Sequence, residues 1–296
     1  MTDSTLTGGV DETAAQSATH HYTKKEYIDG FPVPGPSLAP VDQKLGGLAM
    51  LVGTWKGRGN TMLAVPSKQG LFRAINHPHT NEVLTYTVAP PAPNRGGFNQ
   101  PDISLTGLHY KHEVIDAKTI EPLHVELGFW LNVPATVDPV AHAGLIRELS
   151  IPHGNVAMMY GEAKAHEGPY TFPPYQAIPF PKENFPDPSI YDSDNTGDVN
   201  KELNDAQKGL TFLKTEVLTV KTRSHADIVN IPDLVKQAKS SSATATFAVS
   251  IVSRDGGDPF YMLQYSQVIM LQFPALENGP IINWPHTAVA TLYKTE

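Results

Sequence analysis

The chain has 296 residues, of which 40% are hydrophobic and 18% are charged, and its formal net charge is -8 at pH 7. That length is sufficient for one or two domains with a substantial core. The negative charge, without any cluster of Lys or Arg, argues against a nucleic-acid binder. The lack of cysteine excludes disulfides, thiolate-bound zinc, iron–sulfur clusters and thiol catalysis.

The N-terminal region does not have the pattern of a folded domain. Residues 1–20 are polar and rich in Ser, Thr and Ala, and they lack the basic start and apolar run of a secretory signal, so we expect a disordered tail. Residues 31–40 (FPVPGPSLAP) are typical of an extended arm. No stretch approaches the ~20 apolar residues of a membrane span. We therefore expect a cytoplasmic protein in which residues 1–40 precede a single domain, residues 41–296.

Short segments of alternating hydrophobicity dominate this domain, and 26 prolines and 23 glycines leave little room for long helices. The predicted strands are Leu51–Thr61, Thr80–Ala89, Ile103–Ile115, His124–Val133, Leu145–Pro152, Val156–Ala165, Leu210–Thr222, Thr244–Arg254, Tyr261–Phe273 and Ala288–Lys294. Short helices are predicted at Gln43–Leu51 and Pro232–Lys239. This pattern favours an all-β fold, an antiparallel barrel or sandwich, and we predict a β-barrel of about ten strands.

A long segment at about residues 168–204 interrupts the strand pattern. It is rich in proline and acidic residues and shows no period. Loops of this length are usually functional flaps, partner-binding segments or plain insertions.

The first candidate for a functional motif is the glycine-rich run Gly53–Gly59 (GTWKGRG). A phosphate-binding loop would need a helix after it, and none is predicted here. We therefore interpret the glycines as the bend of a first barrel strand, with Trp55 filling the floor of the barrel. Arg58 could contact a ligand only if its side chain points inward.

A second candidate is the strand that contains LHVELGFW, residues 123–130. Alternation along a strand places His124, Glu126, Gly128 and Trp130 on one face. Such a face is unusual for bulk solvent and suits a cavity wall, although a single strand histidine is often structural. Two ligands two residues apart are weak evidence for a metal.

Two further histidines follow strands or begin them. His153 lies between Pro152 and Gly154, where the backbone of a turn would fix the direction of its side chain. His286 begins a terminal strand and is followed on the same face by small residues. The space beside its imidazole would suit a planar macrocycle, and neutral imidazole is a normal ligand of haem iron. Each histidine could also be an ordinary part of a turn or strand start.

Three stretches, in this order, resemble the nitrobindin family: GTWKGRG, LHVELGFW, and the last hairpin with LQYSQVIMLQF and WPHTAVATLYK. Nitrobindins are β-barrels of about ten antiparallel strands, similar in shape to lipocalins. They bind haem b through one histidine, and their ferric form reacts with nitric oxide or isomerises peroxynitrite to nitrate.

The resemblance implies a role for five residues of this chain. His286 corresponds to the haem ligand, and therefore to the iron-binding residue. Leu123 and His124 correspond to residues on the opposite side of the haem, His153 lies near the place of a distal polar residue, and Met270 corresponds to a distal methionine. The chain is much longer than a minimal nitrobindin, and its additional residues lie in the N-terminal arm and the long insertion.

Three functions remain open from the sequence. The first is a haem protein whose iron reacts with NO or peroxynitrite. The second is a haem enzyme, resembling a peroxidase, in which His153 and His124 are catalytic and the substrate is peroxide or a small organic molecule. The third is a haem-free carrier of a hydrophobic small molecule. All three imply a small-molecule ligand, with neither nucleic acid nor membrane as a partner, and sheet edges and an extended arm are compatible with a homodimer.

Overall fold

The chain divides into two units of very different size. The computed structural model describes residues 27–28, 31–32, 43–66, 72–98, 100–181, 184, 197–232, 238–274 and 279–295. In the first unit, Met1–Val33, strands β1 (Tyr27–Ile28) and β2 (Phe31–Pro32) pair antiparallel. The second unit, Pro34–Glu296, contains the remaining elements. The predicted tail (residues 1–20), the proposed boundary at residue 40 and most of the predicted helix Pro232–Lys239 lie outside the described residues.

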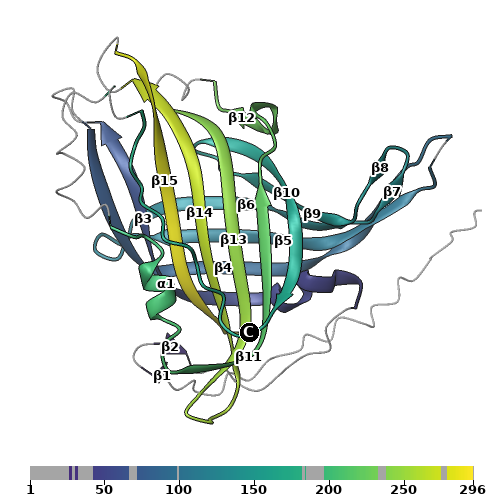
Figure 1. Cartoon of the computed structure of the whole chain (residues 1–296), viewed down its shortest axis with the longest axis horizontal. Coiled ribbons are helices and arrows are strands. Elements are labelled where there is room, and N and C mark those ends of the chain that lie inside the picture. The colour runs from purple at the N-terminus through teal and green to yellow at the C-terminus, as the bar shows by residue number, and fades with distance from the viewer. Residues whose placement is uncertain are drawn as a thin grey trace, which may run out of the picture. The chain divides into compact units, whose positions relative to one another are not determined.

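Ten long antiparallel strands of the second unit close into a barrel, and several of them run side by side in Figure 1. In chain order, which is also their order around the barrel, they are β3 (Gly53–Pro66), β4 (Phe72–Asn94), β5 (Ile103–Ile115), β6 (Pro122–Val133), β9 (Gly144–Ser150), β10 (Asn155–His166), β11 (Leu210–Lys221), β13 (Lys239–Arg254), β14 (Phe260–Pro274) and β15 (Ile281–Lys294). The pairing of β15 with β3 and that of β10 with β11 complete the ring. The predicted all-β, ten-stranded barrel is confirmed.

Several smaller elements accompany the ten barrel strands. They are the 3₁₀ helices η1 (Gln43–Leu51) and η4 (His225–Asp227), the short helix α1 (Lys201–Asp205), β12 (Ile228–Asn230) beside β10, and the ribbon of β7 (Thr136–Val137) and β8 (Val140–Ala141). Sequence analysis anticipated η1 with its observed bounds but not α1. No helix among the described residues is long and apolar enough to cross a membrane.

The η1 helix and the start of β3 fill one end of the barrel, which we call the closed end. Leu45, Leu48 and Leu51 of η1 are buried there together with Trp55. The indole Nε1 of Trp55 donates a hydrogen bond of 2.6 Å to the carbonyl of Leu51. The structural interpretation of the glycine-rich run is supported, because a Cβ on Gly57 would lie 2.2 Å from the carbonyl oxygen of Thr291. Arg58 is exposed.

Strand β15 begins several residues earlier than predicted and contains a proline. Its pairing with β14 extends back to Ile281, whereas its pairing with β3 begins only at Thr287. Before Thr287, β15 pairs continuously with β14 on one side, and its other side meets Phe180 in an isolated bridge at Asn283, which leaves Pro285 without a ladder partner there. A proline, which lacks a backbone N–H, is tolerated at such an edge-like position.

The described part of the long insertion covers the outer wall of the barrel. Phe172 and Leu203 pack with three outward side chains, Val217, Ala248 and Val289, from β11, β13 and β15. Two amide side chains support this packing. The carboxamide of Asn204 donates to the carbonyl of Phe172 and accepts from its backbone N–H, and Gln264 donates to the carbonyl of Leu203. The insertion is thus, in its described part, an outer layer that buries apolar wall residues.

Candidate functional site

The inward face of β6 carries the polar residues that its alternation predicts. Glu126 and Trp130 are fully buried, whereas Leu127 and Phe129 on the other face are 46% and 43% exposed. His124 shares the inward face, and its side chain is 22% exposed. The predicted division of this strand into two faces is therefore confirmed.

An ion pair with several further polar contacts lies in the middle of the barrel. Arg147 of β9 donates from Nη2 to Glu126 Oε1 at 2.6 Å and from Nη1 to Gln267 Oε1 at 2.6 Å. The hydroxyl of Tyr110 also donates to Glu126. Arg147 lies over the rings of Tyr110, Trp130 and Phe247, with its Cζ between 4.9 and 5.6 Å from their centroids. Its charge is therefore paired and enclosed by aromatic faces.

This pairing outweighs the cost of burial for both charges. Burial alone raises the pKa of Glu126, but the charge of Arg147 and the nearby His124 hold that pKa well below its usual range. Burial alone lowers the pKa of Arg147, and the carboxylate of Glu126 reverses the shift, so that the pKa is raised. Both groups are charged at neutral pH.

A second buried carboxylate lies beside the first pair. Glu82 Oε1 accepts hydrogen bonds from the hydroxyl of Tyr265 at 2.7 Å and from Nε2 of His112 at 2.9 Å. His112 and Tyr265 also meet edge to face, with ring centroids 5.9 Å apart. Glu82 thereby determines the direction of the His112 ring and makes Nε2 its protonated nitrogen.

Further imidazole rings lie between His112 and one end of the barrel. We call this end the histidine end and define it by His124, His153 and His286. The ring of His124 lies 5.6 Å from that of His112 and 5.2 Å from that of His153, both edge to face. His153 is exposed, in the turn between β9 and β10, where the N–H of Gly154 bonds to the carbonyl of Ile151. Burial, together with the charge of His124, lowers the pKa of His153.

His286 points to the interior from β15. It pairs with Ile269 of β14, which belongs to the interior core, as does Ala290 on the same face of β15. Burial, with smaller effects from the charges of His124 and His153, lowers the pKa of His286 to about 4. His286 is therefore neutral at pH 7.

The other two predicted site residues are not brought into this group. Leu123 falls at an irregularity of the β5–β6 register, between the pairs Val114–His124 and Ile115–Pro122. Met270 alternates with Ile269 and with Leu271, which both belong to or pack on the interior core, so it lies on the outward face of β14.

Four further residues of this region were not predicted as site residues: His112, Glu82, Arg147 and Tyr265. The sequence does contain a signal that could have identified them. Each is a polar or charged residue at an inward position of a strand whose other inward residues are mostly apolar. Arg147, for example, lies between Leu145 and Leu149, which are both buried in the core. Buried charges of this kind require partners, and their presence on several strands implies a common polar cluster.

Two histidines and one glutamate of the polar interior are spaced so that they could hold a metal ion. One donor atom from each of His112, His124 and Glu126 lies within 4.8 Å of the other two. His286 also presents a neutral nitrogen to the interior.

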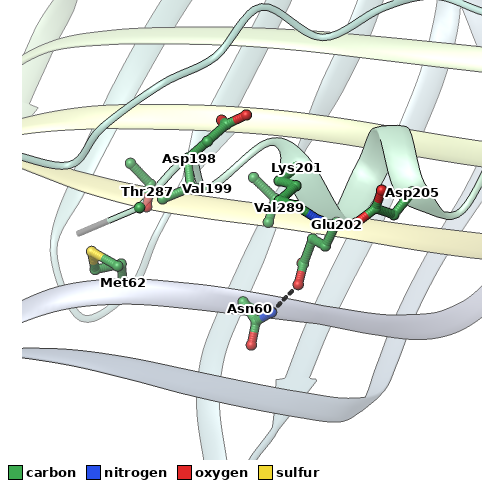
Figure 2. A pocket seen from close by; sticks show the side chains of 10 residues that line it. Asn60, Met62, Asp198, Val199, Lys201, Glu202, Asp205, Thr287 and Val289 are labelled. Atoms are coloured by element: carbon green, nitrogen blue, oxygen red, sulfur yellow. Dashed lines mark hydrogen bonds and ion pairs between the residues drawn. The ribbon is translucent and has the colours of Figure 1, made fainter. Parts of the chain in front are cut away.

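A separate hollow of about 220 Å³ lies on the outer wall, between α1 and the strands β3 and β15. Figure 2 shows Glu202 of α1 pointing across it toward Asn60, whose amide donates to the carboxylate. Asp198, Lys201 and Asp205 line the same hollow, and Lys201 is paired with Asp205. This hollow belongs to the contact of the insertion with the wall.

Comparisons with known proteins add little to this geometry. No model of a known protein family matches the chain, and no curated protein sequence matches it. Among solved structures, the chain is similar to Rv2717c from M. tuberculosis, with a TM-score of 0.39 and 15% sequence identity, over 88% of this chain and 100% of that chain. A similarity at this level says nothing about what the chain binds.

Proposed function

We propose that the histidine end of the barrel binds haem b, with His286 as the ligand of the iron. The proposal rests on one observation above the others: His286 is an inward, partly buried imidazole that stays neutral at pH 7. A neutral imidazole nitrogen is the form that binds haem iron. The sequence resemblance to nitrobindins supports the same residue.

Small side chains beside His286 support room for a flat ligand there. The next two inward residues of β15 are Ala288 and Ala290, which add only methyl groups beside the imidazole. Pro285 restricts the backbone immediately before it, so less conformational freedom is lost when the ring is held by a ligand. Large apolar groups are also close, since Trp284 stacks on Phe273 with 5.3 Å between ring centroids.

His124 and His153 would face the other side of the proposed ligand. When bound, haem supplies an iron centre that reacts with small ligands such as nitric oxide or peroxynitrite. The chain's residues would hold the porphyrin, and the apolar core beyond the histidine end would keep water from the interior. His153, on its exposed turn, would stand where a small ligand enters.

A haemin titration of the purified chain tests the proposal. We expect one haemin per chain, a Soret band that sharpens on binding, and loss of that band in His286→Ala. Free imidazole should restore the band in this variant if the pocket remains intact. His109→Ala is the matched control, because His109 is an exposed histidine on β5.

The proposal fails if the wild-type chain does not bind haemin, or if His286→Ala binds it with unchanged affinity and spectrum. Native mass spectrometry of the chain as expressed distinguishes a haem protein from a haem-free carrier of a hydrophobic small molecule. A lipid-like mass in place of a porphyrin would favour the haem-free carrier.

A specific observation also favours the peroxide-using alternative. His153 lies beside His124, and its lowered pKa keeps its ring neutral and able to accept a proton at pH 7. If the protein is such an enzyme, His153→Ala should reduce peroxide-dependent turnover at least about tenfold while haem binding is retained. Equal and negligible turnover by both proteins would reject the enzyme and leave the haem protein intact.

A further inference from the structure

We propose that His112, His124 and Glu126 form a binding site for a divalent transition-metal ion, zinc or ferrous iron. This site does not require haem, since none of its ligands is His286. It lies deeper in the barrel than the exposed His153, beside the Arg147–Glu126 pair.

The register of two strands brings the three donors together. In the antiparallel pair of β5 and β6, His112 lies directly opposite Glu126, and Val114 lies opposite His124. His124 and Glu126 are two residues apart on the inward face of β6, so His112 is a direct neighbour of one and a diagonal neighbour of the other. Side chains in such positions can touch.

The donor atoms are already close to the spacing that an ion needs. Zinc binds nitrogen and oxygen at 2.0–2.2 Å, so two of its ligands are about 3.3 Å apart. His124 Nε2 and Glu126 Oε2 are 3.4 Å apart, and all three donors lie within 4.8 Å of one another. The longest of these separations would have to shorten by up to about 1.5 Å for all three donors to bind one ion.

The carboxylate of Glu126 is oriented for such a role. Its Oε1 accepts hydrogen bonds from Arg147 and Tyr110. Its Oε2 is buried and faces Nε2 of His124 at 3.4 Å, and no other described group donates a hydrogen bond to it. One oxygen therefore anchors the group while the other keeps its lone pairs for a cation.

Glu82 provides the outer support that metal-binding histidines usually have. Because Nε2 of His112 is bonded to Glu82, the proposed site would use Nδ1 of His112 for the ion. A carboxylate that accepts the second N–H of a histidine ligand fixes its tautomer and raises its basicity. Tyr265 holds this carboxylate in turn.

The donor set selects the kind of ion. Two imidazoles and one carboxylate suit zinc or ferrous iron, whereas calcium and magnesium prefer oxygen ligands alone. Three protein ligands leave at least one coordination position open for water or a small ligand. An ion here would also hold the ring of His124 in one orientation at the histidine end.

Calorimetric titration of the full-length, haem-free chain with zinc chloride tests the site, and cobalt(II) serves as a visible probe of the same ligands. We expect one zinc per chain, and His112→Asn and His124→Asn should each weaken binding at least about a hundredfold. Glu82→Gln should weaken it about ten- to a hundredfold. His109→Asn, on the same strand as His112, should bind zinc like the wild type.

The outcome separates this site from the proposed haem site. His286→Ala should keep zinc affinity, and His112→Asn should keep haemin binding. If His112→Asn loses its cooperative unfolding transition, its zinc affinity is not interpretable. The test then rests on His124→Asn, because His124 is more exposed than His112. The proposal is overturned if the wild type binds no zinc, or if a cooperatively folded His124→Asn binds it as tightly as His109→Asn.

Discussion

The two ends of the barrel are built from opposite chemistry. At the closed end, leucines of η1 and Trp55 are buried, and the polar atoms among them are bonded: Trp55 donates to Leu51, and the amide of Asn132 donates to the carbonyl of Leu45. At the histidine end, the imidazoles of His153 and His286 form no hydrogen bond with another described residue.

The difference separates stability from function. Fully bonded, apolar packing at one end holds the barrel together, and neutral nitrogens at the other end remain available to a ligand. Arg147 lies between the two ends and belongs to the stabilising part, because it satisfies the charge of Glu126 through Oε1, while Oε2 faces His124. Buried polar groups without such mutual pairing are typical of functional sites.

The largest effect should follow from breaking the central ion pair. Arg147→Leu leaves the carboxylate of Glu126 buried beside a methyl-rich side chain, and we expect the free energy of unfolding to fall by about 4 kcal/mol in urea titrations. The double variant Glu126→Leu/Arg147→Leu should recover most of this loss. A loss below about 1 kcal/mol in Arg147→Leu would mean that the pair does not stabilise the barrel.

Removing a leucine from the closed end should separate the two ends experimentally. Leu48 is fully buried in η1, so Leu48→Ala should cost about 3 kcal/mol through lost contacts and a cavity. Haemin affinity of the folded variant should be unchanged, because the change lies at the other end. A parallel loss of haemin affinity and spectrum would contradict the separation of roles.

Acid should weaken the protein through the histidine end. The pKa of His286 is about 4 when folded, and its ordinary value is 6.5, so the unfolded chain binds the proton first as the pH falls. Stability is therefore complete above pH 6.5 and declines toward pH 4, by about 2 kcal/mol at pH 5. Urea titrations at pH 7 and pH 5 should show this decline in wild type and a smaller one in His286→Gln. Equal declines would assign the pH dependence to other groups.

The smallest effect should come from the hydroxyl that supports Glu82. Tyr265→Phe removes the bond of 2.7 Å to Glu82 Oε1 while it keeps the stacking of the ring on Phe247. We expect a loss of about 1 kcal/mol in unfolding free energy. Phe247→Leu serves as the comparison, because it removes packing around Arg147. If Tyr265→Phe lowers the free energy of unfolding as much as Phe247→Leu does, the hydrogen bond has more than a modest role.

The strands were predictable because period two is visible in each of them. The observed bounds of β5, Ile103–Ile115, coincide with the prediction, and those of most other strands differ by a few residues. The last strand was predicted as Ala288–Lys294, and the structure begins it at Ile281. Sequence patterns do not reveal that this part of the strand pairs continuously with β14 and meets Phe180 on its other side at Asn283.

The site was predictable only in part, because its members come from distant strands. His124, His153 and His286 were predicted from their local surroundings, and the fold brings the rings of His124 and His153 into contact. His112 and Arg147 have no unusual neighbours in the sequence, and their meaning appears only when the register places them beside Glu126. Met270 shows the opposite error, since similarity to a motif indicated a lining residue and alternation along β14 directs it outward.

A crystal structure of the full chain purified with haemin tests the central claim most directly. We expect density for one porphyrin at the histidine end, with its iron bonded to a ring nitrogen of His286 and with His124 and His153 across from it. A porphyrin bonded to another residue, or seated on the outer wall, would contradict the account. So would crystals grown with excess haemin that contain no porphyrin.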